Sequence, residues 1–560
     1  MKWLDLNGIW DFAFQEKKTL ADAVLPEVFP DVMCVPGAFD AMPEWYCRRG
    51  TAWYRRDFEV PEDCAQTQLC LEGMGLRGRF FVDGQEIGTS ELAYSPLEIP
   101  AGPLTAGRHT LTAAVDNTFE GGHQPGLFLP YYDFYAFGGF YGGVKLKMMQ
   151  GAFALDRVLV RTLDHQTGRV RLSLEFLGDA PEKVSAVIGF DHAPGQEYVL
   201  NGREVELTVP DFRLWSPDDP ALHTVTVQVP GCGEVTETFG IREIKCCGRK
   251  LYLNGKELYL RGFNRHESSG MTGGSSADSL MLTDLQNLKN LHCNFVRGSH
   301  YTQNPRFLEM CDRMGLLVWD ETLGWGNTPE QLADPGFRAM QVEQMDLMIR
   351  NAFNHPSVII WGFLNEFASD TPEGEAIGKL LCDTARAWDS GRLVTFACCR
   401  PLTDVANKYT DFVAYNTYPG WIPQNEEEAQ LEPTETMLDN QKTILRSLRS
   451  RYPDKPIIVS EMGTCGLYGQ HDAANAQWTE EFQAEYLESV IRTVFSEPDI
   501  CGLAIWQFCD AKSFLRKGAN IRCKPLAQNL AGVFDTYRRP KLSAGVVRRM
   551  FEKGEKEFQK

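Results

Sequence analysis

The chain has 560 residues, of which 43% are hydrophobic and 11% aromatic, and its formal net charge at pH 7 is −19. This length exceeds one ordinary hydrophobic core and predicts two or three compact domains. The acidic charge argues against non-specific attraction to nucleic acid or to anionic membranes, because both require a basic surface.

The cysteine pattern indicates a reducing compartment. There are 16 cysteines, and the adjacent pairs Cys246/Cys247 and Cys398/Cys399 do not have the C-x-x-C spacing of a zinc or redox site. Such usage is typical of free thiols in the cytosol. The opening residues MKWLDLNGIWDFAF lack the apolar stretch of a secretory signal, and no run of about 18 apolar residues occurs. We therefore expect a cytoplasmic protein without a membrane partner.

The first 245 residues read as short strands separated by turns. RGRFFVDGQEIGTS predicts a hairpin around Asp83-Gly84, and AGRHTLTAAVDN predicts a further strand. Period-two alternation continues after residue 154 in RVLVRTL, GRVRLSLEFL and HTVTVQVPG, with no long helical pattern. We predict a β-sandwich over residues 1–150 and a second, immunoglobulin-like β-sandwich over residues 151–245.

Residues 246–560 show a different sequence pattern, in which short apolar runs alternate with amphipathic stretches of helix length. Two such stretches are SADSLMLTDLQNLKNLH and TEEFQAEYLESVIRTVFS. The eight apolar runs are LYLRGFN, NFVRGSH, LLVWDE, VIIWGFLNE, RLVTFACC, FVAYNTY, PIIVSEMG and GLAIWQFCD. Eight strand–helix units predict a (β/α)8 barrel, the TIM-barrel fold, whose chemistry lies at the C-terminal ends of its strands.

Two glutamates end buried strands. VIIWGFLNE delivers Glu366 at the end of the fourth run, and PIIVSEMG delivers Glu461 at the end of the seventh. Strands of a parallel barrel are apolar throughout because both faces are buried, whereas their last residues emerge at the mouth. Paired carboxylates there suit glycosidic cleavage, in which one protonates the leaving oxygen and the other attacks or activates water. The alternative is that each glutamate caps a helix or pairs with an arginine.

The order of several motifs along the chain identifies a resemblance. The motifs are LNGIWDF at 6–12, WYRRDF at 53–58, FNRHE at 263–267, RGSHY at 297–301, WDE at 319–321 and NHPSVIIWGFLNE at 354–366. Together they resemble glycoside hydrolase family 2, the family of β-glucuronidases and β-galactosidases, and the match spans essentially the whole chain. The resemblance implies a sugar-binding-like jelly roll at the N-terminus and a retaining exo-β-glycosidase, with Glu366 as acid/base and Glu461 as nucleophile.

The resemblance also implies substrate-binding roles for polar residues at other strand ends. Asn365 would bind the sugar 2-hydroxyl, a contact that strengthens in the transition state. His266 and His300 would orient sugar hydroxyls, although structural histidines at a barrel rim are the alternative. Asn416 and Tyr418 end the sixth strand, and such a tyrosine donates to the nucleophile.

Two aromatic segments complete the expected site. Trp506, in AIWQF, would form an apolar floor under the sugar, and ordinary core packing is the alternative. Asp133, in YYDFYAFGGFYGG, resembles the jelly-roll loop that reaches the barrel mouth in glucuronidases. A loop so rich in aromatic residues is equally consistent with a contact between domains.

The expected sugar depends on one departure from the family pattern. Glucuronidases of the family carry an Asn-x-Lys motif that grips the substrate carboxylate, whereas QNLAGVFDTYRRPK has Asn529 and then Ala531 in the lysine's place. A charge-assisted contact contributes about 1.5–3 kcal/mol, and a buried unpaired anion costs several kcal/mol more. We therefore expect a neutral β-hexoside, such as a β-galactoside, as substrate.

A basic segment provides a reason to consider a uronide as the alternative substrate. Residues 511–527 contain Lys512, Arg516, Lys517, Arg522 and Lys524, one of which would replace the missing lysine in a β-glucuronidase or β-galacturonidase. A solvated basic loop is the alternative.

Other functional classes have less support. A non-catalytic carbohydrate-binding protein would not need both strand-end glutamates, and no G-x-S-x-G elbow of an acyl hydrolase occurs. We expect no cofactor or metal, because side chains supply both proton transfer and covalent catalysis. The expected partner is a glycoside or oligosaccharide substrate, and the resemblance implies a homo-oligomer.

Overall fold

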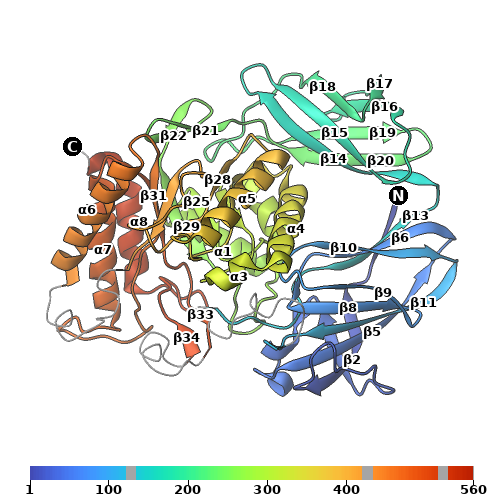
Figure 1. Ribbon diagram of the computed structural model, residues 1–560, viewed down its shortest axis with the longest axis horizontal. Coiled ribbons are helices and arrows are strands. Elements are labelled where there is room, and N and C mark those ends of the chain that lie inside the picture. The colour runs from blue at the N-terminus through green and yellow to red at the C-terminus, as the bar shows by residue number, and fades with distance from the viewer. Residues whose placement is uncertain (121–133, 419–432, 515–526, 559–560) are drawn as a thin grey trace.

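The computed structural model describes residues 1–120, 134–418, 433–514 and 527–558. Two sheet-rich units and one helix-covered barrel follow one another along the chain (Figure 1). The jelly roll, in blue, and the immunoglobulin-like sandwich, in cyan to green, lie beside the barrel, in green to red. This is the predicted fold class.

The N-terminal unit is a β-sandwich. Its larger sheet has the order β3-β2-β5-β11-β8-β9, and its smaller sheets have the orders β1-β13-β6-β10 and β4-β12-β7. The strands are β1 (Lys2–Asp5), β2 (Gly8–Glu16), β3 (Asp31–Val35), β4 (Gly37–Ala38), β5 (Gly50–Val60), β6 (Cys64–Leu71), β7 (Met74–Gly75), β8 (Arg77–Val82), β9 (Gln85–Ser90), β10 (Leu97–Leu104), β11 (Gly107–Asp116), β12 (Gly139–Phe140) and β13 (Val144–Met149), with 3-10 turns η1 (Phe39–Ala41) and η2 (Pro43–Trp45).

The predicted hairpin in this unit is confirmed. Strands β8 and β9 pair antiparallel and are joined by Asp83 and Gly84, whose φ angles are 51° and 79°. Two left-handed residues in succession make the turn whose twist matches a hairpin, and Asp-Gly is a preferred pair for it.

The second unit is a smaller sandwich of two antiparallel sheets, β14-β15-β18 and β17-β16-β19-β20. Its strands are β14 (Phe153–Asp164), β15 (Arg169–Gly178), β16 (Lys183–Phe190), β17 (Gln196–Asn201), β18 (Glu204–Thr208), β19 (His223–Val229) and β20 (Gly233–Phe239). Alternate residues of each strand enter a shared core, as the period-two pattern predicts. A small sheet of β21 (Ile244–Cys247), β22 (Lys250–Leu253) and β23 (Lys256–Leu258) leads into the barrel.

The barrel sheet is parallel, in the order β28-β27-β26-β25-β24-β32-β31-β30-β29. Strands β28 and β29 are parts of one run interrupted at Phe396, so the sheet closes with the eight predicted strands. The strands are β24 (Leu260–Arg265), β25 (Phe295–Gly298), β26 (Leu317–Glu321), β27 (Val358–Gly362), β28 (Leu393–Thr395), β29 (Ala397–Cys398), β30 (Val413–Asn416), β31 (Ile457–Glu461) and β32 (Ile500–Ile505). A two-stranded sheet of β33 (Ala511–Lys512) and β34 (Gln528–Asn529) follows.

Helices surround the barrel. They are α1 (Asp278–Asn290), α2 (Pro305–Met314), α3 (Pro329–Ala333), α4 (Pro335–Ala352), α5 (Pro372–Trp388), α6 (Pro433–Arg451), α7 (Glu480–Ser496) and α8 (Leu542–Lys553), with a 3-10 turn η7 (Glu555–Glu557). Five of them begin with proline, which is preset for the first helical turn. Thr371 shows the usual start, because its side chain accepts from the Gly374 amide.

The jelly roll packs against the mouth of the barrel. Tyr94 stacks on Tyr301, with ring centroids 4.1 Å apart, and Phe134 lies 4.8 Å from the His266 ring. The backbone amide of Tyr135 donates to the Lys512 carbonyl at 2.8 Å. The N-terminal unit therefore contributes to the walls around the strand ends.

Candidate active site

Glu366 lies just beyond the end of β27 in an unusual backbone conformation. Its φ is 57°, a left-handed value that a residue with a side chain adopts at a cost. The Glu366 amide donates to the Ala397 carbonyl at 3.0 Å, and the Arg400 side chain donates to the Glu366 carbonyl at 3.0 Å. These contacts hold the half-buried carboxyl group at the barrel mouth.

Glu461 is the last residue of β31 and is 3% exposed. Arg297 donates to its Oε1 at 2.6 Å, and the Tyr418 hydroxyl donates to its Oε2. Burial raises the pKa of the Glu461 carboxyl to about 7, while the Arg297 charge and the Tyr418 hydrogen bond oppose the rise. The carboxyl is thus fixed through both oxygens by groups that favour its ionised form.

Arg297, from β25, lies at the centre of the site and is fully buried. Its Nη1 also donates to Asn264 Oδ1 at 3.0 Å, and its Nε and Nη2 form a bidentate pair with Glu321 at 3.0 Å each. Burial lowers its pKa and the carboxylates of Glu321 and Glu461 raise it, with a net upward shift. Arg297 therefore remains a cation shared by two carboxylates.

Asn365 and Asn416 connect the two glutamates. Asn416 Nδ2 donates to Glu366 Oε1 at 2.9 Å and approaches Asn365 Oδ1 at 3.2 Å. Arg297 Nη2 donates to the same Asn365 oxygen at 3.0 Å. A continuous chain of contacts therefore runs from Glu366 to Glu461, and the two carboxyl groups belong to one site.

The amide of Asn365 is oriented by these bonds. Its oxygen accepts from both Arg297 and Asn416, so its Nδ2 faces elsewhere. Within the described part of the chain, this buried nitrogen has no hydrogen-bond partner. A buried unsatisfied donor is costly, so an acceptor on a bound ligand would stabilise it.

An aromatic wall flanks the carboxylates. The rings of His300 and Trp506 stack with centroids 5.3 Å apart, and His266 meets Trp506 edge-on at 5.3 Å. All three side chains are buried, and Trp506 Nε1 has no acceptor among the described residues. The structure thus brings both predicted histidines and the predicted tryptophan together.

Asn529 and Ala531 lie beside Trp506. Ala531 belongs to a small apolar cluster with Trp506, Cys465 and Leu530, and the Ala531 amide donates to Asn529 Oδ1 at 3.2 Å. The buried Asn529 Nδ2 has no partner in the described ranges. The position expected to hold a carboxylate-binding lysine is therefore an apolar surface next to the aromatic wall.

Some of the predicted residues lie outside the described ranges. Asp133 lies outside the described residues, as do Arg516, Lys517, Arg522 and Lys524. Lys512 is described, and its ammonium donates to the Tyr46 hydroxyl of the jelly roll at 2.8 Å.

Three site residues were missed by sequence reasoning: Asn264, Arg297 and Glu321. Each lies within the last residues of an apolar strand, in the same quoted runs that supplied the predicted residues. Charged or amide side chains inside such runs are the signal that would have identified them.

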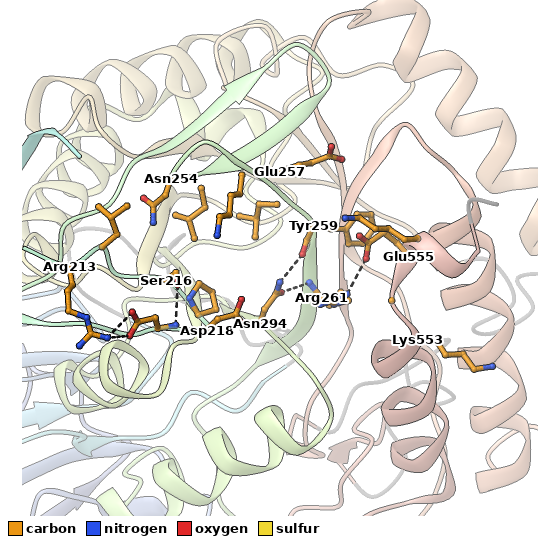
Figure 2. A pocket seen from close by; sticks show the side chains of 18 residues that line it. Arg213, Ser216, Asp218, Asn254, Glu257, Tyr259, Arg261, Asn294, Lys553 and Glu555 are labelled. Carbon is orange, nitrogen blue, oxygen red and sulfur yellow. Dashed lines mark hydrogen bonds and ion pairs between the residues drawn. The ribbon is translucent and has the colours of Figure 1, made fainter. Parts of the chain in front are cut away.

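A cavity of about 680 Å³ lies at the end of the barrel opposite the two glutamates. Figure 2 shows Tyr259, Arg261 and Asn294 around it, at the N-terminal ends of β24 and β25, with Arg261 paired to Glu555 at 3.1 Å. This cavity is separate from the strand ends that carry the two glutamates.

The described residues hold no metal-binding cluster and no helix suited to crossing a membrane. No group of three or more His, Cys, Asp or Glu side chains there is arranged to hold a metal ion. None of the helices in the same residues is long and apolar enough to cross a membrane. The cysteines of this part of the chain are free thiols.

Two β-sandwiches followed by a (β/α)8 barrel, with paired glutamates on strands four and seven, define a glycoside hydrolase. The TIM-barrel model of glycosyl hydrolases family 2 matches residues 244–553, and the model described as glycosyl hydrolases family 2 matches residues 155–242. The chain belongs to glycoside hydrolase family 2, and its substrates are carbohydrates.

Similar proteins span the whole chain. A β-glucuronidase of Streptococcus agalactiae is 26% identical, over 96% of this chain and 94% of its own length. The human β-glucuronidase is 27% identical, over 98% of this chain and 90% of its own. A crystal structure of a family 2 β-galacturonidase from Eisenbergiella tayi, bound to galacturonate, has a TM-score of 0.88 and 28% identity, covering 99% of this chain and 97% of that one.

Proposed function

We propose that the protein is a retaining exo-β-glycosidase that uses Glu461 as nucleophile and Glu366 as acid/base. In the first step a Glu461 oxygen bonds to the anomeric carbon, the glycosidic C–O bond breaks, and the Glu366 proton passes to the leaving oxygen. In the second step water attacks the same carbon, Glu366 takes a proton from that water, and the glycosyl ester breaks.

The observation that carries this proposal is the contact chain between the two glutamates. Asn416 donates to Glu366 and Arg297 donates to Glu461. Asn416 and Arg297 also both donate to the side-chain oxygen of Asn365. Arg297 and Tyr418 favour the ionised carboxylate that a nucleophile requires. The unsatisfied Asn365 Nδ2 is a donor suited to a sugar 2-hydroxyl, the contact that strengthens with oxocarbenium character.

Azide rescue tests the two roles. Glu461→Gly should lose about 10⁴-fold or more in kcat, and added azide should restore turnover of an activated aryl glycoside with formation of the α-glycosyl azide. Glu366→Ala with azide should instead yield the β-glycosyl azide. The half-buried Glu375, paired with Lys408 at 2.7 Å, provides the control Glu375→Gln, which should retain activity. Rescue of neither variant would overturn the assignment.

For the sugar, we propose a β-glycuronide, with β-galacturonides as the first candidate. The support is the whole-length similarity to a protein described as a β-galacturonidase and to others described as β-glucuronidases. A uronate requires a cation in place of the missing lysine. The basic residues at 516–524 are the candidates, and Arg522 and Lys524 are closest in sequence to Asn529.

A neutral β-hexoside, such as a β-galactoside, is the second candidate. The observation that favours it is Ala531, which is 1% exposed and packed with Trp506 and Leu530. A methyl group offers nothing to a carboxylate, whereas it is compatible with an uncharged hydroxymethyl group.

A panel of chromogenic β-galacturonide, β-glucuronide, β-galactoside, β-glucoside and β-fucoside substrates separates the two. We expect the highest kcat/KM for a uronide, and lower uronide turnover in Arg522→Ala or Lys524→Ala with little change for neutral substrates. Dominant turnover of a galactoside would favour the second candidate.

A further inference from the structure

Glu321 is a fully buried carboxylate that the proposed reaction does not use directly. It ends β26, and its Oε2 and Oε1 each accept from Arg297 at 3.0 Å. The same Oε1 lies 2.8 Å from His300 Nδ1. A carboxylate withdrawn from water at this depth requires such partners, and it fixes their geometry in return.

The hydrogen bonds of Arg297 account for all five of its N–H groups. Its Nε donates to Glu321, and its Nη2 donates to Glu321 and Asn365. Its Nη1 donates to Asn264 Oδ1 and Glu461 Oε1. Because a guanidinium is planar and has five donors in a fixed fork, it cannot turn without breaking several of these bonds.

This donor count also assigns the His300 tautomer. Since Arg297 Nη2 uses its protons on Glu321 and Asn365, the Nδ1 of His300 carries a proton and donates to Glu321 Oε1. The 3.2 Å separation between Nη2 and Nδ1 follows, because both nitrogens donate to one oxygen. Glu321 therefore orients the imidazole that stacks on Trp506 as well as the guanidinium.

We propose that Glu321 is a positioning residue for the glycosidase reaction. It holds Arg297 so that one guanidinium places both the Glu461 carboxylate and the Asn365 amide. The inference rests on the proposed roles of Glu461 and Asn365. Reacting atoms must be held in a near-attack geometry, so a loosely held Arg297 would affect two groups at once.

Charge gives Glu321 a second effect. With Glu321 ionised, the Arg297–Glu321 pair is close to neutral, so Arg297 stabilises Glu461 less than an uncompensated cation would. Over-stabilising a nucleophilic carboxylate before it attacks would raise the barrier, because only differential stabilisation of the transition state accelerates the reaction. Glu321 thus limits how strongly Arg297 stabilises the ionised Glu461 carboxyl, in addition to fixing its position.

The variant Glu321→Gln tests both effects while it keeps the shape of the side chain. One acceptor becomes an NH₂ group facing Arg297 and His300, so we expect kcat to fall about 100-fold with a smaller change in KM. The titratable and charged groups near Glu461 among the described residues include Arg297, Tyr418, His300, Glu321 and the Cys399 thiol. Removing the Glu321 charge should shift the acid limb of the kcat/KM profile to lower pH.

Neighbouring Asp320 supplies the matched control. It is a buried acid of the same strand that accepts from the Gln303 amide at 2.9 Å, and burial raises its pKa to about 8, so it is protonated near neutral pH. Asp320→Asn should therefore leave the acid limb unmoved. If Glu321→Gln does not fold, Arg297→Lys tests the same bridge, since an ammonium is a single point that cannot reproduce the fork.

The outcomes separate the two proposals. If azide rescues Glu461→Gly while Glu321→Gln keeps the wild-type kcat and acid limb, the positioning role is wrong and the proposed mechanism stands. Arg297→Lys with unchanged kcat would overturn it in the same way. If azide rescue fails, the nucleophile assignment fails first. The expected result is rescue together with a lower kcat and a displaced limb in Glu321→Gln.

Discussion

The imidazole of His300 lies parallel to the indole of Trp506, with ring centroids 5.3 Å apart and planes inclined by 10°. Stacking holds one face of the imidazole, and the Nδ1 contact with Glu321 at 2.8 Å holds its edge. Aromatic pairs of this kind contribute about 0.5–1.5 kcal/mol beyond their buried area. Trp506 therefore acts both as a wall of the site and as a support for His300.

Trp506→Phe should reduce catalysis and also lower stability. An aromatic ring is kept, but the phenyl group is smaller than the buried indole and leaves space in the packing. The Nε1 donor, which lacks a partner in the described residues, is removed. If this donor binds substrate, its loss costs about 0.5–1.5 kcal/mol, which is roughly 2- to 12-fold in kcat/KM. The measurement is kcat/KM together with the thermal unfolding midpoint.

Trp388→Phe provides the control, because that indole donates to Asp346 at 2.7 Å far from the strand ends. It should lose a little stability and keep wild-type kinetics. Equal kinetic losses in both variants would argue against a substrate contact by Trp506.

Tyr418→Phe should displace the pH profile. The Tyr418 hydroxyl donates to Glu461 Oε2 and so lowers the pKa of a carboxyl that burial raises to about 7. Removing the bond should raise this pKa further, and the acid limb of kcat/KM should move to higher pH. A hydrogen bond to a charged group is worth about 1.5–3 kcal/mol, so the shift should be about one to two pH units.

This direction is opposite to the shift expected for Glu321→Gln, which makes the two variants mutually informative. At a pH well above the new limb, Tyr418→Phe should recover much of its activity. A variant that is equally impaired at every pH would contradict the role of the hydroxyl in ionising Glu461.

The barrel and its two glutamates were predictable because a parallel strand is buried on both faces. An apolar run that ends in Asn365-Glu366 or in Glu461 therefore predicts both a buried strand and the residues that the strand presents at the barrel mouth. The eight runs correspond to the strands of the closed sheet, with the fifth divided at Phe396. Local patterning sufficed because each strand carries its own signal.

The charged centre of the site was not predictable in the same way. Arg297 lies inside the run NFVRGSH, and its five hydrogen bonds go to four residues on other strands or just beyond them: Asn264, Glu321, Asn365 and Glu461. Of the two carboxylates that balance it, Glu321 comes from the adjacent strand β26, whereas Glu461 comes from β31, which does not pair with β25. Burial of a cation is acceptable only when those partners are present, and periodicity carries no information on them.

Glu98→Gln should destabilise the assembly of the three units. Glu98, in β10 of the jelly roll, pairs with Lys147 at 2.9 Å, with Arg157 of β14, and with Arg350 of α4 at 3.3 Å. One carboxylate thus joins both sandwiches to the barrel. Removing it leaves these cations with Asp156 and Glu175 as their remaining acidic partners. We therefore expect a loss of about 1.5–3 kcal/mol in the free energy of unfolding at pH 7, the contribution of hydrogen bonds to a charged group.

The ion pairs of Glu98 also predict how stability changes at acid pH. The neighbouring cations, against the opposing effect of burial, lower the pKa of Glu98 to about 2 from 4.5. Its stabilising contribution is therefore complete above pH 4.5 and is lost as the pH falls towards 2. The difference between wild type and Glu98→Gln should be smaller at pH 3.5 than at pH 7 in denaturant unfolding. Glu62→Gln, which removes an exposed pair with Lys2, should change little at either pH.

Ala531→Lys tests how a uronate is held. Ala531 packs beside Trp506, on the segment that carries Asn529. Contacts with Lys541 and Asp510 hold the backbone of this segment. The buried Lys541 ammonium donates to the Leu530 carbonyl at 3.1 Å and to Asp510 at 2.7 Å, and Asp510 accepts from the Gly532 amide at 3.0 Å. A lysine at 531 would therefore start from a well-held backbone next to the aromatic wall.

Ala531→Lys is most informative when it is used to restore uronide turnover in another variant. If a cation from residues 516–524 binds the carboxylate, Arg522→Ala or Lys524→Ala should lower uronide turnover, and adding Ala531→Lys to that variant should restore it by about 10-fold or more. Ala531→Met, which adds length without charge, controls for filling the space. The kcat/KM ratio of β-galacturonide to β-galactoside is the readout. Restoration by lysine but not by methionine would place a carboxylate beside residue 531, whereas equal effects of both would show that size alone governs this part of the pocket.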